Sequence, residues 1–80
     1  MTDRKKTNIA KMKIGQSGTV MELGIGRGMN RVMAMGLRPG CKITKTSGMF
    51  GHGPVTVTIG NSQLAIGYGM AKKIIVEADS

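Results

Sequence analysis

The side chains with the greatest potential for chemistry in this sequence are a single thiol, Cys41, and a single imidazole, His52. A catalytic cysteine needs an adjacent base and an electropositive setting that stabilises its thiolate. Cys41 alternates with polar residues in a strand-like segment, which predicts an inert inner-face side chain, and no carboxylate lies near His52 in the sequence. The acidic residues number only four, Asp3, Glu22, Glu77 and Asp79. The sequence therefore predicts no catalytic residues and a protein that is not an enzyme.

Metal and cofactor sites lack their usual sequence patterns as well. Zinc sites use C-x-x-C pairs or closely spaced histidines, and this chain has neither. Its eight methionines include the initiator. They could suit a soft metal such as Cu(I), but in a chain with one Phe and one Tyr they serve better as core filler. We expect no metal site and no cofactor, with a transition-metal-binding regulatory module as one alternative.

The glycine-rich run from Gly24 to Gly28 does not match a dinucleotide-binding loop. It reads G-x-G-x-G, whereas the fingerprint requires G-x-G-x-x-G followed by a long helix and, about 20 residues later, an acid. The corresponding position here falls at Thr44 to Thr46, which holds no acid. We interpret the run as a turn between a strand and a helix.

The net charge of +8 is concentrated at the start of the chain. Five of the twelve basic residues lie in the first thirteen positions: Arg4, Lys5, Lys6, Lys11 and Lys13. We expect residues 1–8 to be a flexible basic arm that could contact an anionic membrane surface, and residues 9–80 to be one domain. Nucleic acid is a weaker alternative partner, because only Phe50 and Tyr68 could stack bases. The residues predict no particular oligomeric state.

Glycine and proline turns divide the rest of the chain into segments of strand length. The clearest strand is Val55 to Ile59, where valine and isoleucine alternate with threonine. The other four expected strands are Thr19 to Leu23, Cys41 to Thr44, Gln63 to Ile66 and Lys73 to Glu77. Gly60-Asn61 predicts a tight hairpin after the clearest strand. This spacing predicts a small β-barrel or meander.

A helix of about two turns is expected from Met29 to Met35, capped by Gly36 in the left-handed conformation. Such a short helix needs packing to be stable. We expect Val32 and Met35, at i and i+3, to face the barrel together with Leu37, and Arg31 with Met29 or Met33 to point away. No apolar run approaches the ~20 residues of a membrane helix and no secretory signal is present, so we expect a cytoplasmic domain.

Several motifs resemble the ferrous iron transport protein A (FeoA) family. The run from Arg31 to Gly40 is similar to that family's R-L-x-x-[LM]-G-L-x-P-G signature, with Val32 in place of leucine. Four further segments match in order: Gly15 to Val20 (G-x-x-G-x-V), Gly53 to Val55 (G-x-P-[IV]), Leu64 to Ile66 (L-A-[LI]) and Ala71 to Glu77 (A-x-x-I-x-V-E). The resemblance covers about residues 9 to 77. It departs at Gly67, where an arginine is common, and at Gly69-Met70, where the family is usually acidic.

The resemblance implies a mostly β, SH3-like small five-stranded β-barrel with one short α-helix after the first strand. It also implies a non-enzymatic cytoplasmic accessory of ferrous iron uptake that binds FeoB, the membrane permease with a cytosolic GTPase domain. A related module closes the metal-dependent repressors of the diphtheria toxin repressor family, so a repressor-type accessory domain is another alternative. We expect the partner to contact one face of the helix and its flanks, formed by Arg27, Met29, Arg31, Met33 and Arg38.

Overall fold

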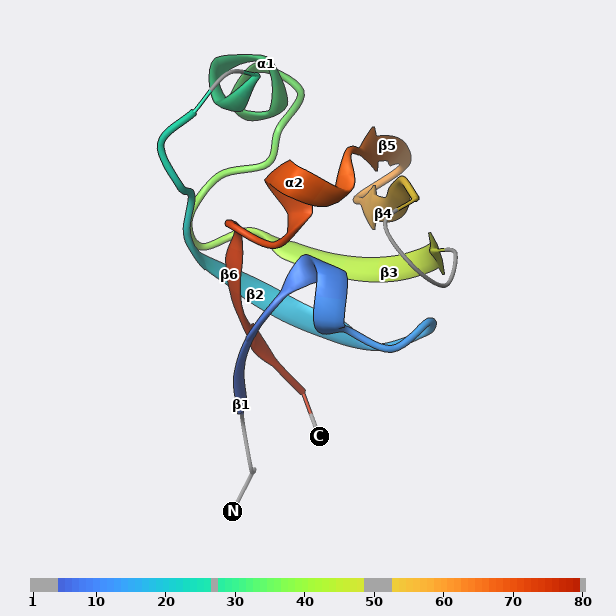
Figure 1. Ribbon diagram of the computed structural model, residues 1–80. Coiled ribbons are helices and arrows are strands. Elements are labelled where there is room, and N and C mark those ends of the chain that lie inside the picture. Colours follow the sequence, from blue (N-terminus) through green and yellow to red (C-terminus); the bar gives the residue numbers. More distant parts are fainter. Residues whose placement is uncertain (1–4, 27, 49–52, 80) are drawn as a thin grey trace.

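The computed structural model describes residues 5–26, 28–48 and 53–79, which form a small, mostly β domain (Figure 1). The strands of this part of the chain are β1 (Lys5–Asn8), β2 (Ser17–Glu22), β3 (Lys42–Gly48), β4 (Val55–Ile59), β5 (Ser62–Ile66) and β6 (Ile75–Ala78). Its helices are a 3₁₀ turn η1 (Ile9–Lys11), α1 (Met29–Ala34) and α2 (Tyr68–Ala71). The strands make one antiparallel sheet in the order β1-β6-β2-β3-β4-β5. The mostly β class is confirmed, with one strand more than expected.

The hairpin of β4 and β5 has the form that the sequence predicts. Val55 and Val57 are buried, whereas the threonines between and after them are half-buried. The pair Ile59↔Ser62 closes the ladder, so only Gly60 and Asn61 form the loop. Gly60 has a φ of 59°, which a glycine adopts without strain. Alternating burial and turn chemistry therefore agree in this part of the chain.

The expectation of a flexible arm is wrong for residues 5–8. They form β1, which pairs with β6 from Lys5↔Ala78 to Asn8↔Ile75. Residues 1–4 lie outside the described part of the chain. The sequence does not show this strand, because its lysines are exposed at the edge of the sheet, where charged side chains are common, and so they give no apolar alternation. The basic start of the chain is therefore a structural strand from Lys5 onward.

Helix α1 lies in the connection between β2 and β3 and ends as the sequence predicts. Gly36 has a φ of 109°. The Gly36 N–H donates to the Met33 carbonyl at 3.1 Å, and the Leu37 N–H donates to the Val32 carbonyl at 3.0 Å. This pair of bonds is the Schellman motif, which satisfies carbonyls that the helix leaves free.

The inward face of α1 differs from the expected one. Met29 and Val32 are buried, whereas Met35 is 47% exposed. The i, i+3 spacing fits Met29 with Val32 as well as Val32 with Met35, so the pattern alone does not fix the rotation of a helix this short. Leu37 is fully buried after the left-handed turn and joins the core below α1. The expected inward position of Met35 is therefore wrong.

We expect Gly36→Ala to lower the free energy of unfolding by about 1 kcal/mol, because a residue with a Cβ is strained at this positive φ. A Cβ at Gly36 would have only Ile59 Cγ2 near it, at 3.9 Å, so the loss reflects backbone strain rather than a clash. Urea unfolding followed by circular dichroism measures the change. Gly69→Ala is the control, because nothing lies within 4 Å of its Cβ position and no positive φ is involved. An equal loss in both variants would contradict the cap.

The sequence patterns do not predict helix α2, because Gly67 and Gly69 favour a turn. It lies between β5 and β6, and Figure 1 shows it between α1 and the strands. The Met70 side chain packs so closely against α1 that a Cβ added to Gly28 would lie 2.5 Å from Met70 Cε. Contact with α2 thus helps to fix the start of α1.

The core is aliphatic with methionine filling, as the composition predicts. Its largest fully buried side chains are Ile9, Leu37, Ile43, Ile66, Ile74, Val20, Val57 and Val76. Lys45 is also buried, at 6% exposure, and its Nζ donates to the carbonyls of Met12 at 2.7 Å and Ala10 at 3.1 Å. A lysine on β3 therefore holds the η1 segment against the sheet.

Candidate protein-binding surfaces around helix α1

Exposed apolar side chains gather at α1. In the described ranges the large apolar residues with high exposure are Ile14 (64%), Met21 (41%), Ile25 (96%), Met33 (38%) and Met35 (47%). Three of these five lie in the short segment 25–35. A local concentration of exposed apolar side chains is typical of a site that binds another molecule.

The exposed residues of α1 lie on two sides of the helix. Successive residues are about 100° apart, and Met29 with Val32 face the core. This rotation places Met33 on one side of that buried stripe and Arg31 with Met35 on the other. The side chains around α1 therefore form two separate surfaces rather than one.

The first of these is the Met33 surface, which consists of Ile25, Met33, Arg38 and Pro39. A shallow groove of about 470 Å³ is lined by residues that include Ile25, Met33 and Pro39. Arg38 Nε donates to the Met33 carbonyl at 3.3 Å, so its guanidinium lies beside the end of α1. The Met33 surface thus combines apolar area with a positive charge.

The second surface is the β5 groove, which lies between α1 and β5 and has a volume of about 320 Å³. Its lining residues are Gly28, Arg31, Val32 and Met35 around α1, Leu64, Ala65, Ile66 and Gly67 in and after β5, and Met70 of α2. Val32, Leu64 and Ile66 are buried at its base, whereas Arg31, Met35 and Ala65 are exposed. The β5 groove is therefore an apolar channel with one arginine at its rim.

Both surfaces carry positive charge without an acidic residue among the side chains that line their grooves. A neighbouring hollow of about 540 Å³, which shares Gly67 and Met70 with the β5 groove, adds Lys72 and Lys73. Apolar area surrounded by arginine and lysine is complementary to an apolar partner segment that carries carboxylates.

The residues of the expected partner-binding set differ in their exposure. Arg31, Met33 and Arg38 are exposed, and the structure brings Met33 and Arg38 together. Met29 is 6% exposed and packs in the core, so its expected outward position is wrong. Arg27 lies outside the described residues. Arg31 lines the β5 groove rather than the groove beside Met33.

Two residues of these surfaces were missed by sequence reasoning. Ile25 is almost fully exposed in the turn before α1, and its isolation between Gly24 and Gly26 was an available signal. Met35 was assigned to the core because its helical spacing to Val32 suits a buried face. Its exposure follows from the rotation of α1, which the sequence does not fix.

The described residues with potential for chemistry do not converge. Within the described ranges, no group of three or more His, Cys, Asp or Glu side chains could hold a metal ion. Cys41 is a free, half-buried thiol that packs against the core, and His52 lies outside those ranges.

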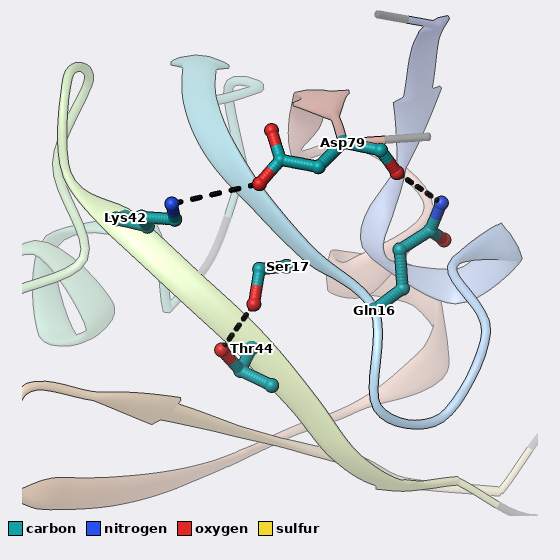
Figure 2. Close-up of polar contacts among 5 residues, drawn as sticks. All are labelled: Gln16, Ser17, Lys42, Thr44 and Asp79. Atoms are coloured by element: carbon teal, nitrogen blue, oxygen red, sulfur yellow. Dashed lines mark hydrogen bonds and ion pairs between the residues drawn. The ribbon is translucent and has the colours of Figure 1, made fainter.

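A polar cluster at the start of β2 has a structural role (Figure 2). Ser17 Oγ and Thr44 Oγ1 are 2.7 Å apart, which links β2 to β3. Gln16 Nε2 donates to the Asp79 carbonyl at 3.0 Å, and Lys42 Nζ lies 3.5 Å from the Asp79 carboxylate. The ion pair is exposed, so it contributes little stability. These contacts join the start of β2 to β3 and to the residue that follows β6.

Basic side chains of the N-terminal segment line a hollow of about 290 Å³ beside Asp79, namely Lys5, Lys11 and Lys13. Tyr68 is one of the two aromatic candidates for base stacking, and its ring centre lies 5.9 Å from Lys72 Nζ. Phe50, the other candidate for base stacking, is not among the described residues.

None of the helices in the described ranges has the length and apolar character that crossing a bilayer requires.

Comparisons with known proteins agree with the motifs. The family model described as FeoA domain matches residues 7–78. A crystal structure of the iron uptake regulatory protein FeoA is 26% identical with a TM-score of 0.82, covering 92% of this chain and 97% of that one. No curated protein matches the sequence significantly.

Two more distant structures share the fold. A Stenotrophomonas maltophilia FeoA complexed with zinc, described as a prokaryotic SH3 domain protein, is 19% identical with a TM-score of 0.74 and 88% coverage of both chains. A manganese-dependent transcriptional repressor is 15% identical with a TM-score of 0.83, covering 95% of this chain and 43% of that one. The expected SH3-like fold is therefore confirmed.

Proposed function

This chain belongs to the FeoA family, an accessory domain family of ferrous iron transport with an SH3-like fold, and from this premise we propose that it binds the cytosolic part of the FeoB permease. In this role it is a non-enzymatic cytoplasmic protein that modulates transport through a protein contact. The contact is made by the Met33 surface together with Arg31.

The observation that carries this proposal is the concentration of exposed apolar and basic side chains around α1. Ile25 exposes 96% of its surface, and Met33 exposes 38%. Methionine adapts its flexible thioether to an irregular partner surface, and arginine forms charge-assisted hydrogen bonds with carboxylates. The Met33 surface therefore provides the apolar centre of the contact, and Arg31 and Arg38 provide its charged margins.

We expect the double variant Arg31→Glu, Met33→Asp to reduce co-purification with the permease by at least about tenfold, because each change places a carboxylate where the contact uses apolar or positive surface. Both side chains are exposed, so the fold is retained. Co-purification from membranes that contain the full-length permease measures the loss.

The matched control for that experiment is Ile14→Asp, which changes an exposed apolar residue outside the surfaces around α1. Its co-purification should equal that of the unmodified protein. Undiminished recovery of the double variant would show that α1 does not contact the permease.

A further inference from the structure

The two edges of the sheet differ in how they are protected from pairing with another chain. The strand order leaves β1 and β5 at the ends. β1 carries two exposed lysines, Lys5 and Lys6, which oppose the addition of a further strand. β5 has the sequence Ser-Gln-Leu-Ala-Ile, without a charge or a proline. Within the described residues β5 pairs only with β4, so its outer N–H and C=O groups form an unprotected edge.

The unprotected edge lies next to an apolar channel. Leu64 and Ile66 of β5 contribute to the base of the β5 groove, and Met35 of α1 contributes to its opposite wall. A strand that paired with β5 would place every second side chain on the side of this groove. Backbone pairing and apolar side-chain burial could therefore occur together, which is how sheet-edge peptide recognition works.

The charges around the β5 groove indicate which kind of polypeptide segment could bind there. The charged residue lining the β5 groove is Arg31, and Lys72 and Lys73 line the adjoining hollow. A carboxylate in the bound segment could form a bidentate pair with the Arg31 guanidinium. A second copy of this chain fits less well, because its net charge of +8 repels an identical molecule.

We propose that the edge of β5 binds an extended, acidic segment of a partner protein, which adds to the sheet as a further strand and directs alternate apolar side chains into the β5 groove. The five residues of β5 match about 17 Å of extended chain. The proposal deepens the proposed function, on which it rests for the identity of the partner. The site and the chemistry of its ligand are assigned independently of that identity.

The test uses a synthetic acetylated peptide in which about five alternating valines and threonines are flanked by glutamates. Its titration into the isotope-labelled protein is followed by the amide NMR signals. We expect shifts in β5 and α1, and at least about tenfold weaker binding by Met35→Glu and by Ala65→Glu. Both substituted side chains are exposed, so these variants keep the fold. Met33→Asp, on the other side of α1, should change the affinity by less than about twofold.

Two further arms identify the mode of binding. Two peptides are N-methylated, one at the odd and one at the even positions, so that each lacks the N–H groups of one edge. One of these peptides should lose at least about tenfold in affinity and the other should not. A peptide with lysines in place of glutamates should bind Arg31→Glu more tightly than the unmodified protein. Equal effects of both methylations, shifts confined to β1, or a dimer formed through β5 without peptide would overturn the proposal.

The outcomes separate this proposal from the proposed function. Permease co-purification that depends on Met33, with no peptide binding at β5, leaves the function standing and overturns the strand proposal. Peptide binding at β5 without co-purification supports the strand proposal and removes the permease as the partner.

Discussion

Gly18→Ala is expected to lower the free energy of unfolding by about 3 kcal/mol, because β2 and β6 approach each other too closely at this position for a side chain. A Cβ added to Gly18 would lie 2.6 Å from Val76 Cγ1, 2.9 Å from the Glu77 carbonyl oxygen and 3.0 Å from Ala78 Cα. Two of these three atoms belong to the backbone of β6, so the clash cannot be relieved by a rotamer change. An alanine at this position would therefore force β2 and β6 apart where Gly18 pairs directly with Ala78.

The expected loss is large for a domain of this size. Small domains have a total stability of about 5 kcal/mol or somewhat more, so the variant should show substantial unfolding at moderate temperature. Urea unfolding at several temperatures measures the loss, and the Gly69→Ala variant again provides the control with open space around the new methyl group. A change below about 0.5 kcal/mol at Gly18 would mean that β2 and β6 are farther apart than the structure places them.

Sequence patterns predicted the parts of the fold in which local chemistry and packing agree. Val55 to Ile59 alternates in sequence and in burial, and Gly60-Asn61 supplies the loop that its hairpin requires. Gly36 was predicted as the cap of α1 for the same reason, because only a residue without a Cβ adopts its φ of 109° without strain. In each case one short segment contains both the signal and its cause.

The unpredicted elements depend on contacts between distant segments. β1 becomes a strand because β6, about 70 residues later, offers it an edge. Tyr68–Ala71 forms a helical turn although it contains a glycine, which lowers helix propensity, and Ala71 at its end is fully buried. Tertiary packing overrides local preference in both places.

The candidate site was predicted only by residue type. Arg31, Met33 and Arg38 are exposed, but helical spacing placed Met35 rather than Met29 toward the core and so did not fix the rotation of α1. Without that rotation, the separation of Arg31 from Met33 could not be seen. The β5 groove was not predicted, since it joins α1 to a strand that lies about 30 residues later in the chain.

Lys45→Ala is the second substitution with a large expected effect, a loss of about 3 kcal/mol in the free energy of unfolding. The Lys45 ammonium donates to the carbonyls of Ala10 and Met12, which lie at the end of η1 and would otherwise lose a partner. A buried acceptor left without a donor costs about 1 to 3 kcal/mol, and truncation of the apolar stem adds to that cost. Lys45→Met keeps most of the stem, so it should lose less than Lys45→Ala. Equal losses would assign the whole effect to the hydrogen bonds.

The pH dependence of this loss tests the charge of Lys45 separately. Burial lowers the pKa of the Lys45 ammonium from its ordinary value of 10.5 because it disfavours the charged form. The unfolded chain therefore binds this proton more tightly than the folded protein does. Between the lowered pKa and 10.5 the free energy of unfolding should rise with pH, whereas below that window Lys45 contributes no slope. The stability difference between the unmodified protein and Lys45→Met, which cancels the other titrating groups, should consequently grow as the pH approaches 10.5. A difference that shrinks would require a raised pKa and hence a carboxylate beside Lys45.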